Sequence, residues 1–501
     1  MENKIKDILK NLKESDKFEC KLSKNSFPKE ALSTYSAFAN TDGGILFLGI
    51  EEKDGDFIPV GVNNPDKIKK DMFDILNNPS RVSKNLISNE MVYEETIDEK
   101  TIIMINIPRA HYKDKPIYLN ENPYQSYKRN HEGDYKCSVD EVKRMIRDSG
   151  DDSLDNTLIN GFSIRDFDTE TIKSYRQRFA SLKPNHPFVG MQDEDFFKKL
   201  GALRENRENG KIEPTMGGLL VFGKTESIKE MLPKFHLEYM DKSILSQERW
   251  TDRVIYDGTW GEANLYNFFF VVINKLYNVI KIPFELEKDG ITRKEITDVH
   301  VALREAFVNA IIHADFRIEE PVKVVRYPNY FEFENPGDLR ISKKDFFRGE
   351  HSKPRNNIIQ EIFRFINLCE RAGSGIPKIM KAVRDEAYKY PEIMEKDGKF
   401  TFRFWNTGII ENIDNLTPEE KKVLEFILKN KKISNKEARE KLDFSKHGAT
   451  DMFNNLIQKE YIEKIGSGKG TYYIMKYSED DKKIRIIENI NEILETLKKH
   501  I

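Results

Sequence analysis

A carboxylate and a carboxamide stand four residues apart in a stretch with helical periodicity. Glu305 and Asn309 lie in a run where apolar residues recur every three or four positions, which predicts an amphipathic helix. Residues four apart are neighbours on one side of a helix, so both polar side chains would face the same space. A carboxylate can polarise a water molecule, and an amide oxygen is a suitable ligand for Mg²⁺. The pair indicates a nucleotide site, although an ordinary polar helix edge can show the same spacing.

Two glycine motifs follow this helix in the order that a nucleotide site would need. Residues 335–337 read Asn-Pro-Gly, and residues 373–376 read Gly-Ser-Gly-Ile. Glycine turns allow backbone N–H groups to approach phosphates closely. The three segments together favour nucleotide binding over an ordinary helix edge.

These segments resemble the N box and glycine boxes of the GHKL ATPases, and most of all their divergent RecG-like branch, whose members read REAxVNAxxH, NPG and GSGI. The resemblance covers about residues 291–410. It implies a GHKL-like α/β sandwich that binds ATP, with Glu305 as the general base or water-orienting residue for ATP hydrolysis and Asn309 as the Mg²⁺ ligand. The cofactor-binding residues that it implies are Asn309, His313, Asn335, Gly337, Gly373 and Gly375.

One position departs from the pattern of the better-known GHKL members. They carry an aspartate that accepts a hydrogen bond from the adenine amino group, where this chain has Asn335. The asparagine oxygen can still accept that hydrogen bond, but the negative charge is lost. ATP remains the expected nucleotide, while the identity of the base and hydrolysis stay open.

The first 148 residues contain a second pattern, made of strands and tight turns. Residues 17–22 alternate apolar and charged side chains, as a half-buried strand does, and residues 45–50 form an apolar run typical of a buried strand. Between them a helical stretch ends in Asp-Gly-Gly at 42–44, which predicts a tight turn. Further strands are predicted at 101–107, 117–119 and 124–128.

This part of the chain resembles the Schlafen/AlbA-type domain, whose members read ES…EFK, then AFANTxGGxLxIGVxD, then KPxYLN…YxR. Those motifs match residues 14–21, 37–50 and 115–129. In bacterial proteins the domain is usually described as a DNA-binding module, and in mammalian Schlafens it can be an endonuclease that cleaves tRNA and rRNA. The resemblance implies a mixed-sheet domain over residues 1–148 that binds DNA or RNA. The basic candidates for phosphate contact are Lys21, Lys128 and Arg129.

Three carboxylates match positions that Schlafen nucleases use: Glu14, Glu19 and Glu52. If they converge, they could hold one or two divalent ions, Mg²⁺ or Mn²⁺, which would activate water and stabilise the leaving oxygen of a phosphodiester. Glutamate replaces aspartate at the third position, and Glu19 could simply form ion pairs with neighbours such as Lys21. Metal-dependent cleavage and plain nucleic-acid binding therefore both remain open.

The middle of the chain, residues 155–290, is predicted to be a connecting α/β region. Residues 215–224 are predicted to form a Gly-Gly turn that leads into a buried strand, and they lack the spacing of a phosphate-binding loop. Residues 266–277 are apolar on nearly every side, which predicts a core or interface helix.

Residues 415–478 predict a winged helix-turn-helix. Capping residues at 417, 434 and 445 precede three helical stretches, and a glycine-rich tip at 466–470 separates two strand-like stretches. In such a domain the third helix reads DNA and the hairpin forms the wing. The candidates for DNA contact are Lys446, His447 and Lys469. A winged helix that mediates protein contact or dimerisation is the alternative.

Residues 479–501 carry isoleucine and leucine side chains along one side of a predicted helix. Such a stripe needs a partner surface, so this helix packs on its own chain or pairs two chains. We therefore expect a homo-oligomer.

The length and composition of the chain limit the class of protein to which it can belong. A length of 501 residues predicts an α+β multidomain protein of three or four domains. The sequence has no run of 18 apolar residues and no apolar signal core at its start, so we expect a cytoplasmic protein without membrane contact. Cys20, Cys137 and Cys369 show neither zinc spacing nor a disulfide framework, and we expect them to be small buried hydrophobes.

The leading hypothesis is an ATP-binding, nucleic-acid-binding regulator, similar to the ATP-binding transcriptional regulators of bacteria and archaea. The second hypothesis is a metal-dependent nuclease that ATP switches, such as an effector of defence against phage. The third is an interaction module with a degenerate nucleotide site. An ATPase or endonuclease activity is open under the first two hypotheses.

Overall fold

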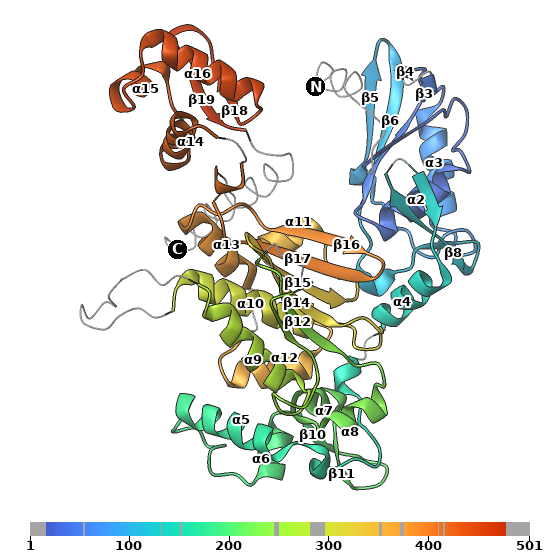
Figure 1. Ribbon diagram of the computed structural model, residues 1–501. Helices are drawn as coiled ribbons and strands as arrows, with labels where there is room; N and C mark the ends of the chain where they lie inside the picture. The colour runs from blue at the N-terminus through green and yellow to red at the C-terminus, as the bar shows by residue number, and fades with distance from the viewer. Residues whose placement is uncertain are drawn as a thin grey trace. The chain divides into compact units, whose positions relative to one another are not determined.

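The computed structural model describes residues 17–53, 56–131, 133–150, 153–244, 250–280, 296–349, 353–370, 375–408, 410–413 and 416–476. The chain divides into two compact units, whose elements are labelled in Figure 1. The first unit comprises residues 1–152 with 340–343, and the second comprises 153–339 with 344–501. Both combine helices with sheets, so the predicted α+β multidomain class is confirmed.

The first unit is built on a four-stranded mixed sheet with the order β1-β2-β6-β5. β1 (Phe18–Lys21) runs parallel to β2 (Gly44–Leu48), whereas β6 (Lys100–Ile107) is antiparallel to β2 and to β5 (Val92–Ile97). The apolar side chains of these strands share a core with helices α2 (Ala31–Asn40) and α3 (Pro65–Leu76). The strands predicted in this region are all present, together with a β3–β4 hairpin (Ile50–Lys53 and Asp56–Pro59).

Buried polar side chains at the end of α2 join the rest of this unit to the sheet. The side chain of Asn40 donates to the carbonyl oxygens of Ile117 (2.9 Å) and Tyr127 (3.0 Å) and accepts from the Ile117 N–H (2.8 Å). Gly43 follows at φ +73°, where a Cβ would lie 2.7 Å from the carbonyl oxygen of Ile107. The Asn-Thr-Asp-Gly-Gly stretch therefore places the short sheet β7 (Tyr118–Leu119), β8 (Asn122–Asn130) and β9 (Gly133–Lys136) against α2. Helix α4 (Val139–Ser149) follows, with a capping box at Ser138.

The second unit contains a six-stranded sheet with the order β13-β12-β14-β15-β17-β16. Only the β12–β14 pair is parallel among these described strands. Alternate residues of each strand point into the core, as the burial of Phe400, Phe402 and Phe404 in β17 shows. The strands are β12 (Leu237–Asp241), β13 (Asp252–Val254), β14 (Val322–Arg326), β15 (Tyr330–Pro336), β16 (Glu392–Lys396) and β17 (Lys399–Trp405).

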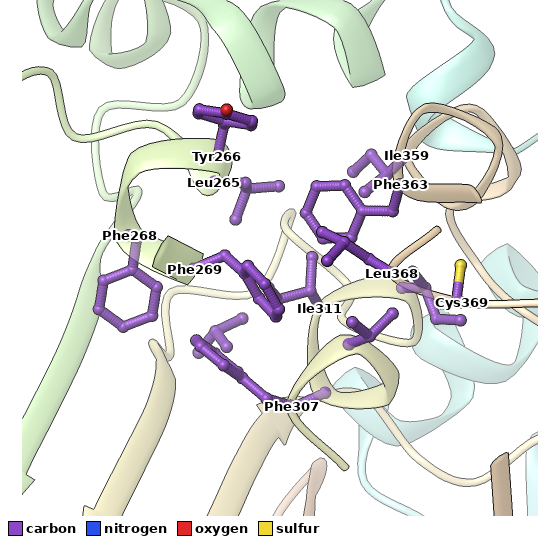
Figure 2. Close-up of a cluster of buried hydrophobic side chains, with 14 of the residues drawn as sticks. Leu265, Tyr266, Phe268, Phe269, Phe307, Ile311, Ile359, Phe363, Leu368 and Cys369 are labelled. Atoms are coloured by element: carbon purple, nitrogen blue, oxygen red, sulfur yellow. The ribbon is translucent and has the colours of Figure 1, made fainter. Parts of the chain in front are cut away.

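Helices cover the core face of this sheet (Figure 1). Figure 2 shows Phe269, Phe307 and Phe363 pointing toward one another from three different helices. The Phe269 ring centroid lies 5.1 Å from that of Phe307 and 5.6 Å from that of Phe363. The helices concerned are α9 (Leu265–Tyr277), α10 (Asp298–Ile312) and α12 (Asn357–Phe365), and α11 (Lys343–Arg348) and α13 (Gly375–Asp385) belong to the same unit.

The region predicted as a connector shares this core. A single cluster of buried side chains runs from Ile159 to Phe404, so the core continues across the boundary predicted near residue 290. The elements that precede β12 are α5 (Thr169–Leu182), α6 (Asp193–Lys199), β10 (Leu203–Glu205), β11 (Ile212–Pro214), α7 (Met216–Phe222) and α8 (Thr225–Met231).

The strand predicted after Thr215 is wrong, because residues 216–222 form helix α7. The Thr215 hydroxyl accepts the Gly218 N–H at 3.1 Å and so caps the helix. A Cβ on Gly218 would lie 2.2 Å from the carbonyl oxygen of Ala202, so glycine lets the helix pack directly on that backbone. A short run of buried apolar residues does not distinguish a strand from a buried helix, which explains the error.

Residues 416–476 contain three helices followed by a two-stranded hairpin. This order of elements is the one predicted from the capping residues, and Thr417 and Ser434 both form capping boxes. The elements are α14 (Pro418–Asn430), α15 (Asn435–Lys441), α16 (Lys446–Gln458), β18 (Ile462–Ile465) and β19 (Tyr472–Met475). The helix predicted in 479–501 lies outside the described residues.

The composition of the chain also led to predictions about membrane-spanning helices and about the cysteines. No helix in the described part of the chain has the length and apolar composition needed to cross a lipid bilayer. The three cysteines are buried and form no disulfide, and burial raises the pKa of Cys137 and of Cys369 to about 12.

Candidate nucleotide site and nucleic-acid surfaces

The candidate nucleotide site starts from Glu305 on helix α10. Its side chain is buried, and a carboxylate oxygen lies 3.3 Å from the Nζ of Lys378 and 3.9 Å from the guanidinium of Arg304. Burial raises the pKa of Glu305, and the two cations oppose this effect only in part. A buried carboxylate with a raised pKa is suited to accept a proton from water.

Gly375, the first residue of α13, lies against both polar residues of α10. A Cβ on Gly375 would lie 2.9 Å from the Oε2 of Glu305 and 3.3 Å from the Nδ2 of Asn309. Glycine therefore lets the start of α13 approach the carboxylate and the carboxamide. The N–H groups at the start of a helix attract anions, so this end of α13 can receive phosphate oxygens. The companion residue Gly373 lies outside the described residues.

Lys378 was not singled out from the sequence. It lies one helical turn after Gly375, so the i, i+3 spacing from that glycine was the available signal. Its ammonium also lies 2.8 Å from the Oε1 of Glu370. Burial lowers the pKa of Lys378, but the hydrogen bond to Glu370 and the charge of Glu305 outweigh burial and raise it. The lysine is therefore a permanent cation beside Glu305.

The Asn-Pro-Gly motif ends strand β15. Asn335 is buried, and its side-chain amide donates to the carbonyl oxygen of Pro336 at 3.2 Å. Gly337 has a φ of +104° and donates its N–H to the carbonyl oxygen of Gly398 at 2.7 Å. A Cβ at residue 337 would lie 2.9 Å from the guanidinium carbon of Arg355, so both the backbone angle and the packing require glycine.

Arg355 and Asn356 connect this loop to the end of α10, although no sequence motif singled them out. Buried Arg355 donates to the carbonyl oxygens of His313 (3.0 Å) and Asp338 (2.6 Å). Asn356 donates to the carbonyl oxygens at positions 311 (3.2 Å) and 314 (2.8 Å). These bonds satisfy carbonyl groups that the helix end leaves open, and they hold His313 next to the Gly337 loop.

In the first unit, Glu19 and Arg129 form a buried ion pair. The Nη2 of Arg129 lies 2.8 Å from the Oε2 of Glu19, and its Nη1 lies 2.9 Å from the Oδ1 of Asp134. The Arg129 guanidinium also lies over the ring of Phe38, and only 1% of its side chain is exposed. The Oε1 of Glu19 pairs with Lys21 at 2.5 Å. The ion pair between Glu19 and Arg129 thus holds strands β1 and β8 together.

The remaining candidates of this unit are placed as follows. Glu52 is exposed on β3, and Lys128 pairs with Glu141 of α4. Glu14 lies outside the described residues. Among the residues that the structure describes, no group of three acidic, histidine or cysteine side chains is arranged to hold a metal ion.

In the C-terminal helices, two of the three basic candidates are exposed. Lys446 and His447 occupy the first turn of α16, which the Ser445 hydroxyl caps by accepting the Gly448 N–H at 3.0 Å. The side chain of Lys469 lies outside the described residues.

Three family profiles match the chain. Residues 14–138 match the family "Schlafen, AlbA_2", and residues 319–404 match "Putative ATP-dependent DNA helicase recG C-terminal". Residues 143–238 match a domain of unknown function, DUF8451. The RecG match begins after α10, so Glu305 and Asn309 precede it, whereas Asn335, Gly337 and Gly375 fall within it.

Several solved structures are similar to the chain. A crystal structure of a protein from Corynebacterium diphtheriae is 14% identical, with a TM-score of 0.40, over 94% of this chain and 98% of that one. The solution structure of the N-terminal domain of a RecG-related protein from Nitrosomonas europaea is 28% identical, with a TM-score of 0.20, over 26% of this chain and 90% of that one. No curated protein matches the sequence.

The two matches therefore show an architecture that joins a Schlafen/AlbA-type domain to a RecG-like domain. It carries a Schlafen/AlbA_2 domain at residues 14–138 and the C-terminal domain of the RecG-type family at residues 319–404. Both resemblances predicted from the sequence motifs are confirmed.

Proposed function

We propose that the protein binds ATP with Mg²⁺ between α10 and the start of α13, and that it is a nucleic-acid-binding regulator. The observation that carries this proposal is the position of Gly375, where a Cβ would lie 2.9 Å from Glu305 and 3.3 Å from Asn309. A carboxylate, a carboxamide and a helix start thereby share one small space. The RecG-type match over residues 319–404 supports the same assignment.

Each residue has a distinct role in this proposal. Asn309 would hold Mg²⁺ through its amide oxygen, and the ion would neutralise charge on the phosphates when bound. The start of α13 receives phosphate oxygens through its N–H groups. Glu305 orients a water molecule or accepts its proton, and Lys378 keeps that carboxylate in place. Gly337 and Asn335 form the turn against which the base lies.

Nucleic-acid binding rests on both ends of the chain. The Schlafen/AlbA_2 domain supports it at the N-terminal end, with Lys21 and Lys128 as partly exposed basic residues. At the C-terminal end, Lys446 and His447 are exposed in the first turn of the third helix of a helix-and-hairpin unit. The start of the third helix is where a winged helix-turn-helix contacts the DNA major groove.

The proposal is tested by titrating ATP and Mg²⁺ into the wild type and an Asn309→Ala variant in a calorimeter. We expect affinity to fall at least roughly tenfold, the loss of about 1.4 kcal/mol. Asn329→Ala, which removes an exposed amide from the turn at the other end of β15, is the matched control and should bind as the wild type does. Equal ATP affinity in the wild type and Asn309→Ala would contradict the proposal.

The nuclease hypothesis requires Glu19 to bind metal, yet Glu19 pairs with Arg129 and Lys21. This pairing favours a structural role for Glu19. Incubation of end-labelled tRNA, single-stranded DNA and duplex DNA with Mn²⁺ or Mg²⁺ decides between the two functions. Cleavage by the wild type that is lost in Glu52→Gln, a change at an exposed residue, would establish a nuclease. Substrates that stay intact with the wild type would favour the regulator.

A further inference from the structure

Three aromatic side chains form a row across one end of the six-stranded sheet, on the face opposite the core. Tyr327 follows β14, Tyr330 begins β15, and Trp405 ends β17. Tyr330 and Trp405 are directly paired across the two strands. All three are partly exposed, whereas the core-facing neighbours Phe331 and Phe404 are fully buried. We call these three side chains the aromatic row.

The rings of the aromatic row are in close contact. The Tyr327 and Tyr330 rings are stacked, with centroids 4.5 Å apart and an interplanar angle of 23°. The Tyr330 and Trp405 rings are tilted, with centroids 4.8 Å apart and an interplanar angle of 50°. The hairpin turn is closed by the Tyr327 N–H, which donates to the Tyr330 carbonyl oxygen at 2.8 Å. The row is therefore a preformed surface on a rigid element.

Cations lie over each ring of the row. The Nζ of Lys389 lies 3.8 Å from the Trp405 centroid, and the Arg403 guanidinium lies 4.5 Å from the Tyr330 centroid. Lys242 lies 5.9 Å from the Tyr327 centroid, at the other end of the row. Lysines thus lie at both ends of the aromatic row.

The carboxylates nearby offset most of this charge. Arg403 pairs with Glu332 and Glu392, each at 2.9 Å, and Lys389 also pairs with Glu392 at 2.8 Å. Glu334, whose charge also acts on Tyr327, pairs with Lys399 at 3.7 Å. The charges around the row are therefore close to balanced, and the lysine side chains are the groups that can contact an anion.

From this arrangement we propose that the aromatic row is a binding site for single-stranded nucleic acid. Bases stack on the outer rings, and the lysines at both ends contact the phosphates. A base reaching Trp405 displaces the flexible Lys389 side chain from the ring face and leaves its ammonium free for the backbone. Aromatic rings on the open face of a sheet are a general way to bind bases, because every base has a stacking face.

Two buried polar atoms without a hydrogen-bond partner favour a ligand site over a purely structural cluster. The indole Nε1 of Trp405 and the Oδ1 of Asn406 are buried without a hydrogen-bond partner in the described structure. A purely structural cluster would be expected to satisfy both groups, because an unpaired buried polar atom costs about 1–3 kcal/mol. The site is also distinct from the nucleotide site, since Tyr330 begins β15 and the Asn-Pro-Gly turn ends it.

The test measures binding of fluorescein-labelled single-stranded DNA and RNA by anisotropy, with duplex DNA for comparison. Trp405→Ala should weaken single-strand binding about 5- to 100-fold, the effect of losing one stacked base. Trp405→Phe keeps a stacking ring and should bind nearly as the wild type does. Tyr256→Ala is the matched control, because Tyr256 is an exposed ring beneath Lys229 but stands outside the row.

Tryptophan fluorescence gives a second readout that does not depend on a variant's affinity. The fraction quenched by a saturating oligonucleotide should be smaller in Trp405→Phe than in the wild type, because the ring in contact with the base is gone. Unchanged single-strand affinity in Trp405→Ala together with equal quenching in Trp405→Phe overturns the aromatic-row site and leaves the proposed regulator intact. A wild type that binds no nucleic acid of any kind overturns both.

Discussion

Glu305 shows how single residues set the chemistry of the proposed nucleotide site. Its carboxylate is buried beside Lys378, which comes from a helix that starts 70 residues later in the chain. Burial raises the pKa of Glu305 and so makes the carboxylate a stronger base, while Lys378 opposes that rise and keeps an opposite charge beside it. Because residue 375 is a glycine, the start of α13 can lie close to the Glu305 carboxylate.

The first prediction concerns this glycine. Gly375→Ala places a methyl group 2.9 Å from the Glu305 carboxylate, so we expect ATP affinity to fall at least roughly tenfold. The cause is displacement of the helix start rather than loss of a ligand atom. Isothermal titration with ATP and Mg²⁺ measures the effect.

Gly190→Ala is the control for that experiment, because a Cβ there meets nothing within 4 Å. It should bind ATP as the wild type does, and thermal unfolding should show that both variants are folded. An unaltered affinity in a folded Gly375→Ala protein would show that the start of α13 does not touch the nucleotide.

At the scale of elements, α12 positions the loop beside the nucleotide site. Its N-terminus is held by Asp155, whose Oδ2 accepts the Ile359 N–H at 3.0 Å and whose other oxygen accepts from Ser153. Arg355 and Asn356 directly precede this helix, and they bond to the end of α10. Asp155, which is distant in sequence, therefore holds in place Arg355 and Asn356, the residues that connect the Gly337 loop to the end of α10.

The second prediction follows from the burial of Asp155. Burial raises its pKa from 3.8 to about 6, despite the hydrogen bonds from Ser153 and from the helix N–H groups. The folded unit therefore favours the protonated acid. Its contribution to stability is fully present below about pH 4 and is lost as the pH rises through 6, by about 3 kcal/mol in total.

Urea unfolding between pH 4 and 7 measures this contribution in the wild type and in Asp155→Asn, which cannot ionise. All three tryptophans, Trp250, Trp260 and Trp405, belong to the second unit, so their fluorescence reports that unit alone. The free energy of unfolding of the wild type should fall relative to that of the variant as the pH rises. A constant difference between the two proteins would show that Asp155 keeps its ordinary pKa.

At the scale of the whole molecule, ATP and nucleic acid should affect each other's binding. An ATP site and nucleic-acid surfaces on one chain permit regulation only if the nucleotide binds two arrangements of the protein with different affinity. Linkage then requires that nucleic acid changes the affinity for ATP by the same factor.

The third prediction is that ATP with Mg²⁺ changes the dissociation constant for labelled DNA or RNA about fivefold or more, a coupling of about 1 kcal/mol. Anisotropy titrations with and without nucleotide measure the change. In Asn309→Ala the two titrations should coincide. Coincident curves in the wild type, under conditions where calorimetry shows ATP bound, would mean that the two activities are independent.

Local patterns in the sequence determined most of the elements. The periodicity around Glu305 and Asn309 predicted α10, and the capping residues Thr417, Ser434 and Ser445 predicted three helices in their observed order. These features depend on residues within one or two turns of each other, so they can be read along the chain. Specific motifs in the same way determined the two family assignments.

Tertiary structure alone decided which of these residues meet. The apolar run at 216–222 forms a helix in which Gly218 packs on the backbone at Ala202, a contact that no local pattern reveals. Arg129 carries a charge suited to phosphate, but it is buried against Glu19 and Asp134. Asp134 is close in sequence, but Glu19 lies on a distant strand. The contacts that offset the cost of burying this charge are therefore complete only when separate segments pack. Sequence thus determined the elements and families, and long-range packing decided the neighbours that set each side chain's chemistry.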